Sequence, residues 1–537
     1  MWRSLDVKTR LIVYSLLLLL CLAAYANSFQ GPFVFDDIVT IVENDSIRHL
    51  PGLVGIPPDT STTGRPIANM TFAINFAVHG LQLPGYHVVN LVIHLVNVLL
   101  LFETLLLILS LTAKNLSVDR HLWVACSVAL IWAVHPLNTE SVTYFIGRTE
   151  SLMGFFFIAG TYCYLKFLRE HDLSYALGTL VLSVCGMLTK EVMVVFPIFI
   201  ACLDWMIGEH RPQVSKGPYQ RKLFFVLLFA TCLIQVVIQL SWPRGTSVGI
   251  NNPVGATPVD YFLSQGPIIF GYLRKTIIPT QLLFDYGPAF KVTLSDVLWP
   301  CLAGIGVLIW ATRTISKRQV VAFCILMALL VLSPSSSFVP LFTQVGAERR
   351  MYLPLIFLLI PPLHFLASHK TRWNPVYAWS LTLVIGVVFT IQTHFRNEDY
   401  RTTDSLWRSV LDVTPTNTRA MTNLAIALEE KGRTSDAVFW LNKAVSSPSP
   451  FEAGAHYALG NIYLRRTAWG IAEKHYTKCV KLKPGHYQAW SNLGIALAEQ
   501  NKMAAAEHAF KTAITLNPNF HAAQDNLKAL KLPRGRH

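Results

Sequence analysis

The sequence predicts an all-α protein in two parts, a bundle of membrane-spanning helices over residues 1–392 and a helical solenoid over residues 393–537. Of the 537 residues, 52% are hydrophobic and only 14% are charged, and the mean hydropathy is +0.41. This composition is too hydrophobic for a soluble globular protein. The apolar residues form runs close to the roughly 20 helical residues that cross a bilayer. The polar C-terminal part repeats with a period of 34 residues.

The bundle is predicted to contain about eleven spans, each an apolar run of nearly the length that crosses a hydrocarbon core. These runs are 11–27, 87–111, 122–134, 151–167, 174–189, 192–207, 223–241, 296–312, 319–333, 351–366 and 375–392. The first run follows a basic segment, as in a signal peptide, but Tyr25-Ala26-Asn27-Ser28 is a poor cleavage site. We therefore expect this run to stay as the first span.

Basic residues are concentrated in alternate loops, which predicts the side of the membrane on which each loop lies. The loops expected to share the cytoplasmic side with the N-terminus contain Lys114 and Arg120, Lys166 and Arg169, Arg211 to Lys222, Arg313 to Arg318, and Lys370 and Arg372. The first opposite loop, 27–86, has five carboxylates against only Arg48 and Arg65. Because the net charge of +14 is mostly in membrane loops, we do not expect a nucleic-acid partner.

The segment 261–279 complicates this topology. It is apolar enough to suggest another span, but Arg274 and Lys275 interrupt it. If it crossed the membrane, the basic residues Arg313, Lys317 and Arg318 would lie outside. We therefore expect a re-entrant or interfacial helix.

The C-terminal part contains a repeat with a strict register. Leu459-Gly460, Tyr463, Ala472, Tyr476 and Pro484 recur as Leu493-Gly494, Leu497, Ala506, Phe510 and Pro518. This pattern is typical of tetratricopeptide repeats, in which small residues let two helices approach and proline ends the second helix. We expect repeats near 421–450, 453–486 and 487–520. Their concave surface is expected to bind a protein or peptide, and a purely structural cap is the alternative.

Two adjacent carboxylates, Asp36 and Asp37, follow the first span in the stretch Gly31-Pro32-Phe33-Val34-Phe35. One carboxylate of such a pair can accept a proton from a hydroxyl while the other orients groups or balances charge. Burial among the neighbouring apolar side chains would raise a carboxylate pKa toward useful basicity. The alternative is an acidic helix cap or a solvated loop.

The Phe33 to Asp37 motif, with Asn44 after it, is followed in order by other recognisable stretches. These are Arg65-Pro66 with Thr71-Phe72 and Gly80-Leu81, Gly85 to Asn90 with His94, Val134 to Pro136 with Thr139 to Val142 and Gly147 to Glu150, Met187 to Glu191, and Glu348 to Pro354. Together they resemble the transmembrane and tetratricopeptide repeat-containing O-mannosyltransferases and their bacterial relatives, over nearly the whole chain.

The resemblance implies a glycosyltransferase of the GT-C type, which moves a sugar from a polyprenyl-phosphate or dolichyl-phosphate carrier to a hydroxyl on the outer side. In that family the first-loop acid is the usual catalytic base. The resemblance carries this role to Asp36, with Asp37 as its partner. The sequence does not decide which of the two abstracts the proton.

A lipid-phosphate donor requires cations near the membrane surface. Four candidates lie in loops on the predicted outer side: Arg148, Lys190, Arg349 and Arg350. Glu140, Glu150 and Glu191 are expected to pair with them, and Tyr352 is a supporting residue of the same motif as Arg349 and Arg350. Simple anchoring of these side chains at the membrane surface is the alternative.

No spacing of cysteines and histidines indicates a metal site, and no P-loop indicates direct use of a nucleotide. We therefore expect no required cofactor, with a divalent metal left open. His87, His94 and His135 are expected to be packed or hydrogen-bonded. The expected partners are a lipid-linked sugar donor, a protein on the repeats, and membrane lipids.

The alternatives to an enzyme are a membrane-anchored repeat scaffold without catalysis and, less favoured, a transporter, for which we find no inverted symmetry. The stretch 242–260 is short and the repeats number about three, as in the bacterial relatives. This favours a bacterial inner membrane with periplasmic repeats. An endoplasmic reticulum membrane with lumenal repeats is the other setting.

Overall fold

The computed structural model describes residues 6–53, 55–58, 60–112, 116–208, 218–242, 257–287, 294–315, 319–336, 344–368, 374–447 and 449–531. All regular elements in these ranges are helices, as the apolar runs and the 34-residue repeat predict. The chain divides into two compact units, Met1–Phe284 with Ala289–Thr402, and Asp285–Pro288 with Thr403–His537. The division falls after Thr402 rather than at 392, because the last helix of the first unit continues to Asp399.

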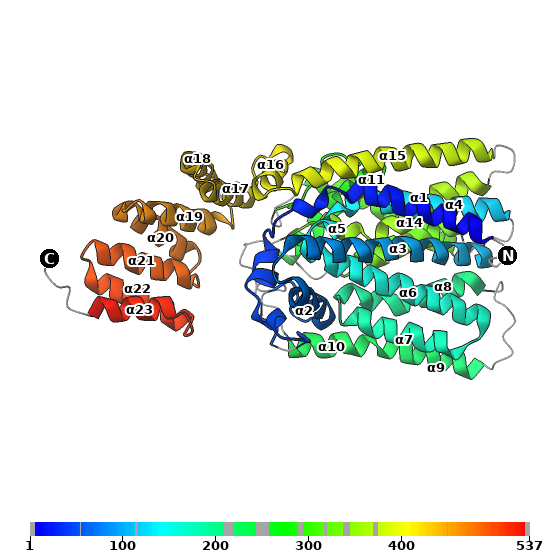
Figure 1. Cartoon of the computed structure of the whole chain (residues 1–537), viewed down its shortest axis with the longest axis horizontal. Coiled ribbons are helices and arrows are strands. Elements are labelled where there is room, and N and C mark those ends of the chain that lie inside the picture. Colours follow the sequence, from blue (N-terminus) through cyan, green and yellow to red (C-terminus); the bar gives the residue numbers. More distant parts are fainter. Residues whose placement is uncertain are drawn as a thin grey trace. The chain divides into compact units, whose positions relative to one another are not determined.

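The first unit is a bundle in which α3 packs along α6, and α15 packs along α1 (Figure 1). Its helices are α1 (Val7–Tyr25), α2 (Pro66–His79), α3 (Leu83–Thr112), α4 (Val118–Ala133), α5 (Thr139–Val142), α6 (Arg148–Glu170), α7 (Leu173–Met187), α8 (Phe196–Ile207), α9 (Pro218–Ala230), α10 (Cys232–Ser241), α11 (Pro258–Ile277), α12 (Leu294–Ile315), α13 (Val320–Leu332), α14 (Pro354–Ser368) and α15 (Pro375–Asp399). Two short helices, η7 (Glu191–Val195) and η9 (Glu348–Met351), precede α8 and α14.

All the apolar runs expected from the sequence coincide with helices, but fewer of these helices are long enough to count as spans. Six helices in the described residues have the length and hydropathy to cross a membrane, or up to seven if α4 and the bent Pro136–Val142 segment form one span. The sequence predicts about eleven spans. The remaining four runs form α7, α8, α13 and α14, which are only 15, 12, 13 and 15 residues long.

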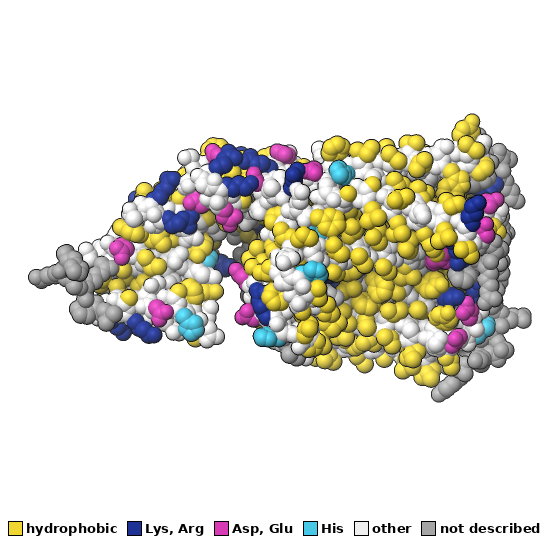
Figure 2. Space-filling model, viewed as in Figure 1, with side chains coloured by type: hydrophobic (Ala, Val, Ile, Leu, Met, Phe, Trp, Pro, Cys, Tyr) yellow, Lys and Arg dark blue, Asp and Glu magenta, His cyan; other side chains and the backbone are white. Residues whose placement is uncertain are grey.

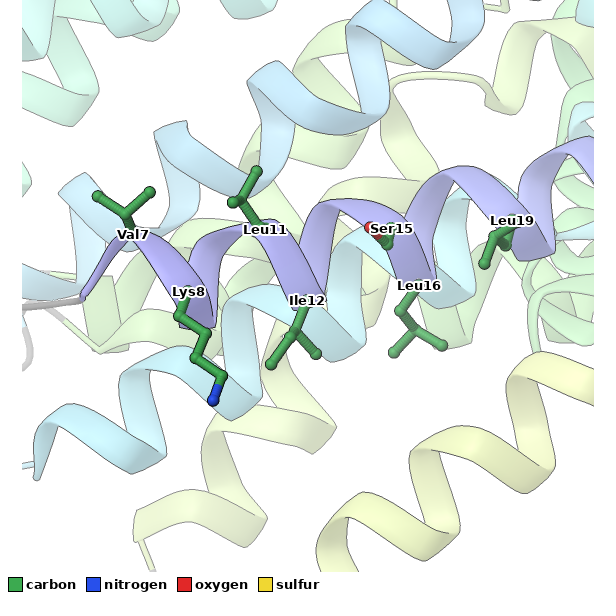
Figure 3. A pocket seen from close by; sticks show the side chains of 7 residues that line it. All are labelled: Val7, Lys8, Leu11, Ile12, Ser15, Leu16 and Leu19. Carbon is green, nitrogen blue, oxygen red and sulfur yellow. The ribbon is translucent and has the colours of Figure 1, made fainter.

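The outer surface of the bundle is apolar. Figure 2 shows hydrophobic side chains covering the middle of its visible face, with charged side chains toward both ends. The outward face of α1 lines a shallow hollow, in which Lys8 is the one charged side chain among those labelled in Figure 3. Val7, Ile12 and Leu19 on this face are 74%, 61% and 66% exposed. A band of this kind is expected of a multi-pass membrane protein, in which lipid covers the apolar side chains.

The α11 helix is not among the helices that qualify as spans. It begins with a capping box at Thr257 and Asp260 and contains Pro267. Its side chains hydrogen-bond along the segment before η9, from Tyr261 to the Ser335 carbonyl at 3.1 Å and from Gln265 to the Val345 carbonyl at 3.2 Å. This helix therefore supports the chain that leads into η9, and its hydropathy agrees with the expectation that it does not cross the membrane.

The second unit is a series of antiparallel helix pairs. Its helices are α16 (Thr403–Val413), α17 (Thr418–Glu430), α18 (Thr434–Val445), α19 (Glu452–Arg465), α20 (Trp469–Leu482), α21 (Tyr487–Glu499), α22 (Met503–Leu516) and α23 (His521–Lys531). The small and large positions of the repeat meet as the sequence predicts. A Cβ on Gly460 would lie 2.5 Å from the Tyr476 ring, and one on Gly494 would lie 2.6 Å from the Phe510 ring.

We predict that Gly494→Ala destabilises the α21–α22 pair by about 1–3 kcal/mol, because the added methyl group overlaps the Phe510 ring. Gly454→Ala is a matched control, since this glycine is also helical but has open space around it. Hydrogen exchange of the full chain should show faster exchange over 487–516 for Gly494→Ala only. Equal exchange in the two variants would contradict the packing.

Candidate active site

The loop after α1 places Asp36 and Asp37 in different surroundings. Phe35 has φ of +51°, in the left-handed region that a phenylalanine rarely adopts and that costs about 1–2 kcal/mol. The Asp36 N–H then donates to the Tyr144 hydroxyl at 3.1 Å. The Asp37 carboxylate turns inward, and it accepts from the Val34 N–H at 3.1 Å and from the Ile146 N–H at 3.0 Å.

The two carboxylates therefore differ in accessibility. Asp37 has no exposed surface, and burial raises its pKa well above the ordinary range, although the two N–H donors oppose this shift. Asp36 is half-buried, and its Oδ2 accepts from the Ser61 hydroxyl at 3.4 Å. Asp37 fastens the loop to the 144–146 segment, whereas Asp36 is the carboxylate that an external group can reach.

Three cation–carboxylate pairs lie near this loop: Arg65 with Glu191, Lys190 with Glu150, and Arg349 with Glu140. We call these six residues together with Asp36 the charged cluster. Arg65 precedes α2 and donates through two nitrogens to Glu191 at 3.0–3.3 Å. Its Nη1 also donates to the Ser61 carbonyl at 2.8 Å, so Ser61 connects Arg65 to Asp36.

The members of the charged cluster influence one another. Burial lowers the pKa of Lys190 to about 8; Glu150 opposes this shift, and the positive charges of Arg65 and Arg349 add to it. Burial alone would lower the pKa of Arg349, but Glu140 and then Tyr144, Asp36 and Glu150 raise it above the ordinary value. The cluster is therefore one electrostatic unit that joins the Asp36 loop to three cations.

Backbone placement accounts for the Arg349–Glu140 contact. Arg349 lies in η9, and its backbone N–H donates to Glu140 Oε2 at 2.9 Å while its guanidinium contacts the other oxygen. Its Nη2 also donates to Gln344 Oε1 at 2.6 Å. Glu140 is 1% exposed, so its contacts hold the Arg349 guanidinium in a fixed position.

The phosphate contact that the sequence predicts for Arg148 stays a prediction, and the structure shows its guanidinium bound within the protein. The side chain is fully buried and makes four hydrogen bonds to neutral acceptors. Two of these run to Asn90 and Asn75, both at 2.7 Å, and its guanidinium lies 4.4 Å from the Phe72 ring centre. Arg148 thereby ties α6 to α2 and α3, and its geometry favours a structural role.

Arg350 and Tyr352 are also held by the protein itself. Arg350 donates to the carbonyls of Gln344 and Val345 at 2.8 and 3.1 Å. The Tyr352 hydroxyl lies in the bundle interior, 2.8 Å from His94 Nδ1 and 3.0 Å from Asn97 Nδ2. Of the expected residues, the structure brings together Asp36, Glu140, Glu150, Lys190, Glu191 and Arg349, with Asp37 directly beneath.

Sequence reasoning missed Arg65, Ser61 and Tyr144 as members of this site. Arg65 had a signal, because it is one of only two basic residues in the acidic loop 27–86. Tyr144 and Ser61 had none, because their positions depend on contacts between segments far apart in the sequence.

The histidines are hydrogen-bonded as expected. His87 Nε2 lies 3.1 Å from the Gly31 carbonyl, His94 Nε2 lies 2.9 Å from the Ala133 carbonyl, and His135 Nε2 lies 3.1 Å from the Thr276 carbonyl. Among the residues that the structure describes, no group of three or more His, Cys, Asp or Glu side chains is placed to hold a metal ion.

Known proteins are similar to one of the repeats and to most of the chain. Residues 487–520 match the family model of the tetratricopeptide repeat. Over 94% of its length the chain is 24% identical to "Protein O-mannosyl-transferase Tmtc3" of Drosophila melanogaster, and over 81% it is 27% identical to "Protein O-mannosyl-transferase F38B6.6" of Caenorhabditis elegans. Over 93% it is 26% identical to "Protein O-mannosyl-transferase TMTC3" of Homo sapiens. The chain is a homologue of these protein O-mannosyl-transferases.

These aligned regions make up 64%, 62% and 60% of the three O-mannosyl-transferase relatives, so the chain spans about three-fifths of their length. A solved structure, "Crystal structure of APC/C hetero-tetramer Cut9-Hcn1", covers 87% of this chain and is itself covered to 94%, at 12% identity. Its TM-score of 0.26 is too low to indicate a shared fold.

We predict that Asp37→Asn destabilises the bundle by about 1–3 kcal/mol, because the amide NH₂ would face one of the two backbone N–H donors. Asp36→Asn should cost less stability than Asp37→Asn, since Asp36 is only half-buried. The thermal unfolding midpoint of the purified full chain in detergent measures both. An Asp37→Asn protein as stable as wild type would be inconsistent with this division of roles.

Proposed function

We propose that this chain is an integral membrane glycosyltransferase that moves a sugar from a polyprenyl-phosphate carrier to hydroxyl groups of protein acceptors. The observation that carries the proposal is the convergence of Asp36 with three partnered cations in the charged cluster. The names of the O-mannosyl-transferase relatives support the reaction class. A reachable carboxylate beside buried cations has the chemistry that transfer from a phosphate leaving group requires.

In the proposed reaction Asp36 takes the proton of the acceptor hydroxyl. The hydroxyl oxygen forms a bond to the anomeric carbon of the sugar, and the bond from that carbon to the carrier phosphate oxygen breaks. The phosphate departs with the electron pair, and Lys190 and Arg349 stabilise its added negative charge. Arg148 and Arg350 are left out of this role because their guanidinium groups are engaged by neutral acceptors of the protein.

We assign Asp36 to the outer or lumenal side from the distribution of basic residues. Arg10, Arg120, Arg169 and Arg313 lie near the helix ends opposite to the Asp36 loop. Basic residues gather on the cytoplasmic side of membrane proteins. A bacterial inner membrane with periplasmic repeats, favoured by the short architecture, and an endoplasmic reticulum membrane with lumenal repeats both satisfy this orientation.

We assign the repeats the binding of the protein acceptor or of a protein that presents it. Membrane lipids cover the apolar band and admit the carrier to the bundle. We expect no required cofactor for the proposed reaction, with a divalent metal left open, and we assign Lys190 and Arg349 to the negative charge of the leaving group.

The proposal predicts that Asp36→Asn lowers the transfer rate by about 10²- to 10⁴-fold, because an amide cannot take the proton. Glu43→Gln is the matched control, since Glu43 is an exposed carboxylate in the same loop. The measurement is transfer of labelled sugar from polyprenyl-phosphate donors to membrane protein acceptors, at matched expression.

Equal activity of Asp36→Asn and wild type would remove Asp36 as the base. A wild-type chain that transfers sugar from none of the donors would instead favour the repeat scaffold without catalysis.

A second prediction concerns pH. Lys190 loses its proton as pH rises through its lowered pKa of about 8, so the KM for the donor should rise above that pH. In Lys190→Arg the guanidinium stays charged, and the alkaline rise should disappear. The measurement is donor KM across neutral and alkaline pH for both proteins. The same alkaline rise in both would show that Lys190 does not contact the phosphate.

A further inference from the structure

The chain that presents Arg349 is held by α11, a helix to which the proposed reaction assigns no role. The Tyr272 hydroxyl donates to the Ala347 carbonyl at 2.9 Å and accepts from the Ala347 N–H at 2.7 Å. Both backbone groups of the residue before η9 are therefore bound by one side chain. Tyr272 has no exposed surface, so water does not compete for these bonds.

One turn further along α11, Lys275 forms a buried ion pair with Glu348. The Lys275 Nζ lies 2.7 Å from Glu348 Oε1, and the two side chains are 5% and 2% exposed. The same oxygen accepts from the Leu283 N–H at 2.7 Å. Desolvating two charges costs free energy that their attraction often only balances, so such a pair is weak evidence of a purely stabilising role.

The position of Glu348 connects this pair to the charged cluster. Glu348 directly precedes Arg349, whose backbone N–H and guanidinium both bind Glu140. A displacement of Glu348 therefore moves the peptide unit that orients Arg349. Geometry at a catalytic site has to be held within about 0.5 Å, so small displacements reduce the stabilisation of a leaving group.

The Lys275–Glu348 pair also reaches the other side of the site. Through Leu283 it holds the chain before Phe284, whose ring centre lies 5.0 Å from Tyr144 and 6.2 Å from Phe35. Tyr144 accepts the Asp36 N–H. The Lys275–Glu348 pair is therefore connected both to Arg349 and to the loop that contains Asp36.

We propose that Lys275 and Glu348 are positioning residues that set Arg349 for the donor phosphate, which makes α11 part of the donor site. This proposal rests on the proposed function and extends it. Lys275 and Glu348 do not touch the substrate; they act through Arg349. Losing the pair should therefore weaken use of the donor much more than use of the acceptor.

The experiment compares variants of the full chain in membranes. Glu348→Gln and Lys275→Met each break the pair, the double variant Lys275→Met with Glu348→Gln removes both charges, and Lys275→Glu with Glu348→Lys reverses them. Arg274→Met is the matched control, because Arg274 is the neighbouring basic residue on α11 and is exposed. The donor is a polyprenyl-phosphate sugar, and donor and acceptor KM are measured separately from kcat.

We expect Glu348→Gln to raise the donor KM about tenfold while the acceptor KM stays within about twofold. The reversed pair should recover part of the loss, because it restores the ion pair but leaves the Leu283 N–H without its acceptor, and Arg274→Met should match wild type. In an Arg349→Met background, Glu348→Gln should have no further effect, because the residue through which it acts is already gone.

An active wild type in which Glu348→Gln leaves donor KM unchanged, or changes donor and acceptor KM alike, would overturn the positioning role and leave the proposed function standing. Additive losses with Arg349→Met would also overturn it. A wild type inactive with every donor would overturn the proposed function, and the positioning role with it.

Discussion

The site depends on how the Asp37 carboxylate is buried. One of its oxygens accepts the N–H of Val34, which is near in the sequence, and the other accepts the N–H of Ile146, which is far away. Together with the bond from the Asp36 N–H to the Tyr144 hydroxyl, this link holds the first loop against the 144–146 segment and helps to compensate the left-handed backbone of Phe35. Asp36 gains its orientation from a neighbour that cannot itself reach the substrate. Of the two adjacent acids, Asp37 holds the loop and Asp36 contacts solvent.

The charges of the cluster constrain how a phosphate could enter. Arg65, Lys190 and Arg349 supply three positive charges, and Glu191, Glu150 and Glu140 with an ionised Asp36 supply four negative ones. The sum is one negative charge, so the cluster as folded has no surplus cation. A phosphate must therefore displace a carboxylate from its cation or arrive with a proton. Glu140 has both a guanidinium and a backbone N–H as donors, so it can keep one when the other is taken.

Local patterns allowed the architecture to be predicted from the sequence. Apolar runs and the 34-residue period depend on neighbours along the chain, and they predicted the helices and the packing of Gly460 and Gly494 against aromatic rings. The count of eleven spans stays a prediction, because length and hydropathy select only six or seven helices and α7, α8, α13 and α14 are shorter than a membrane crossing normally requires. The role of Arg148 could not be predicted, because its acceptors Asn75 and Asn90 are 73 and 58 residues away.

Buried ion pairs give the strongest reason to regard this end of the bundle as functional. Lys275 with Glu348, Lys190 with Glu150, and Arg349 with Glu140 are nearly withdrawn from solvent. Replacing such pairs by apolar side chains of similar volume is often neutral or stabilising, so fold stability alone does not account for three of them in one region. Under the proposed function, the anionic donor would exchange with the carboxylates and use the cations that the fold keeps paired without it.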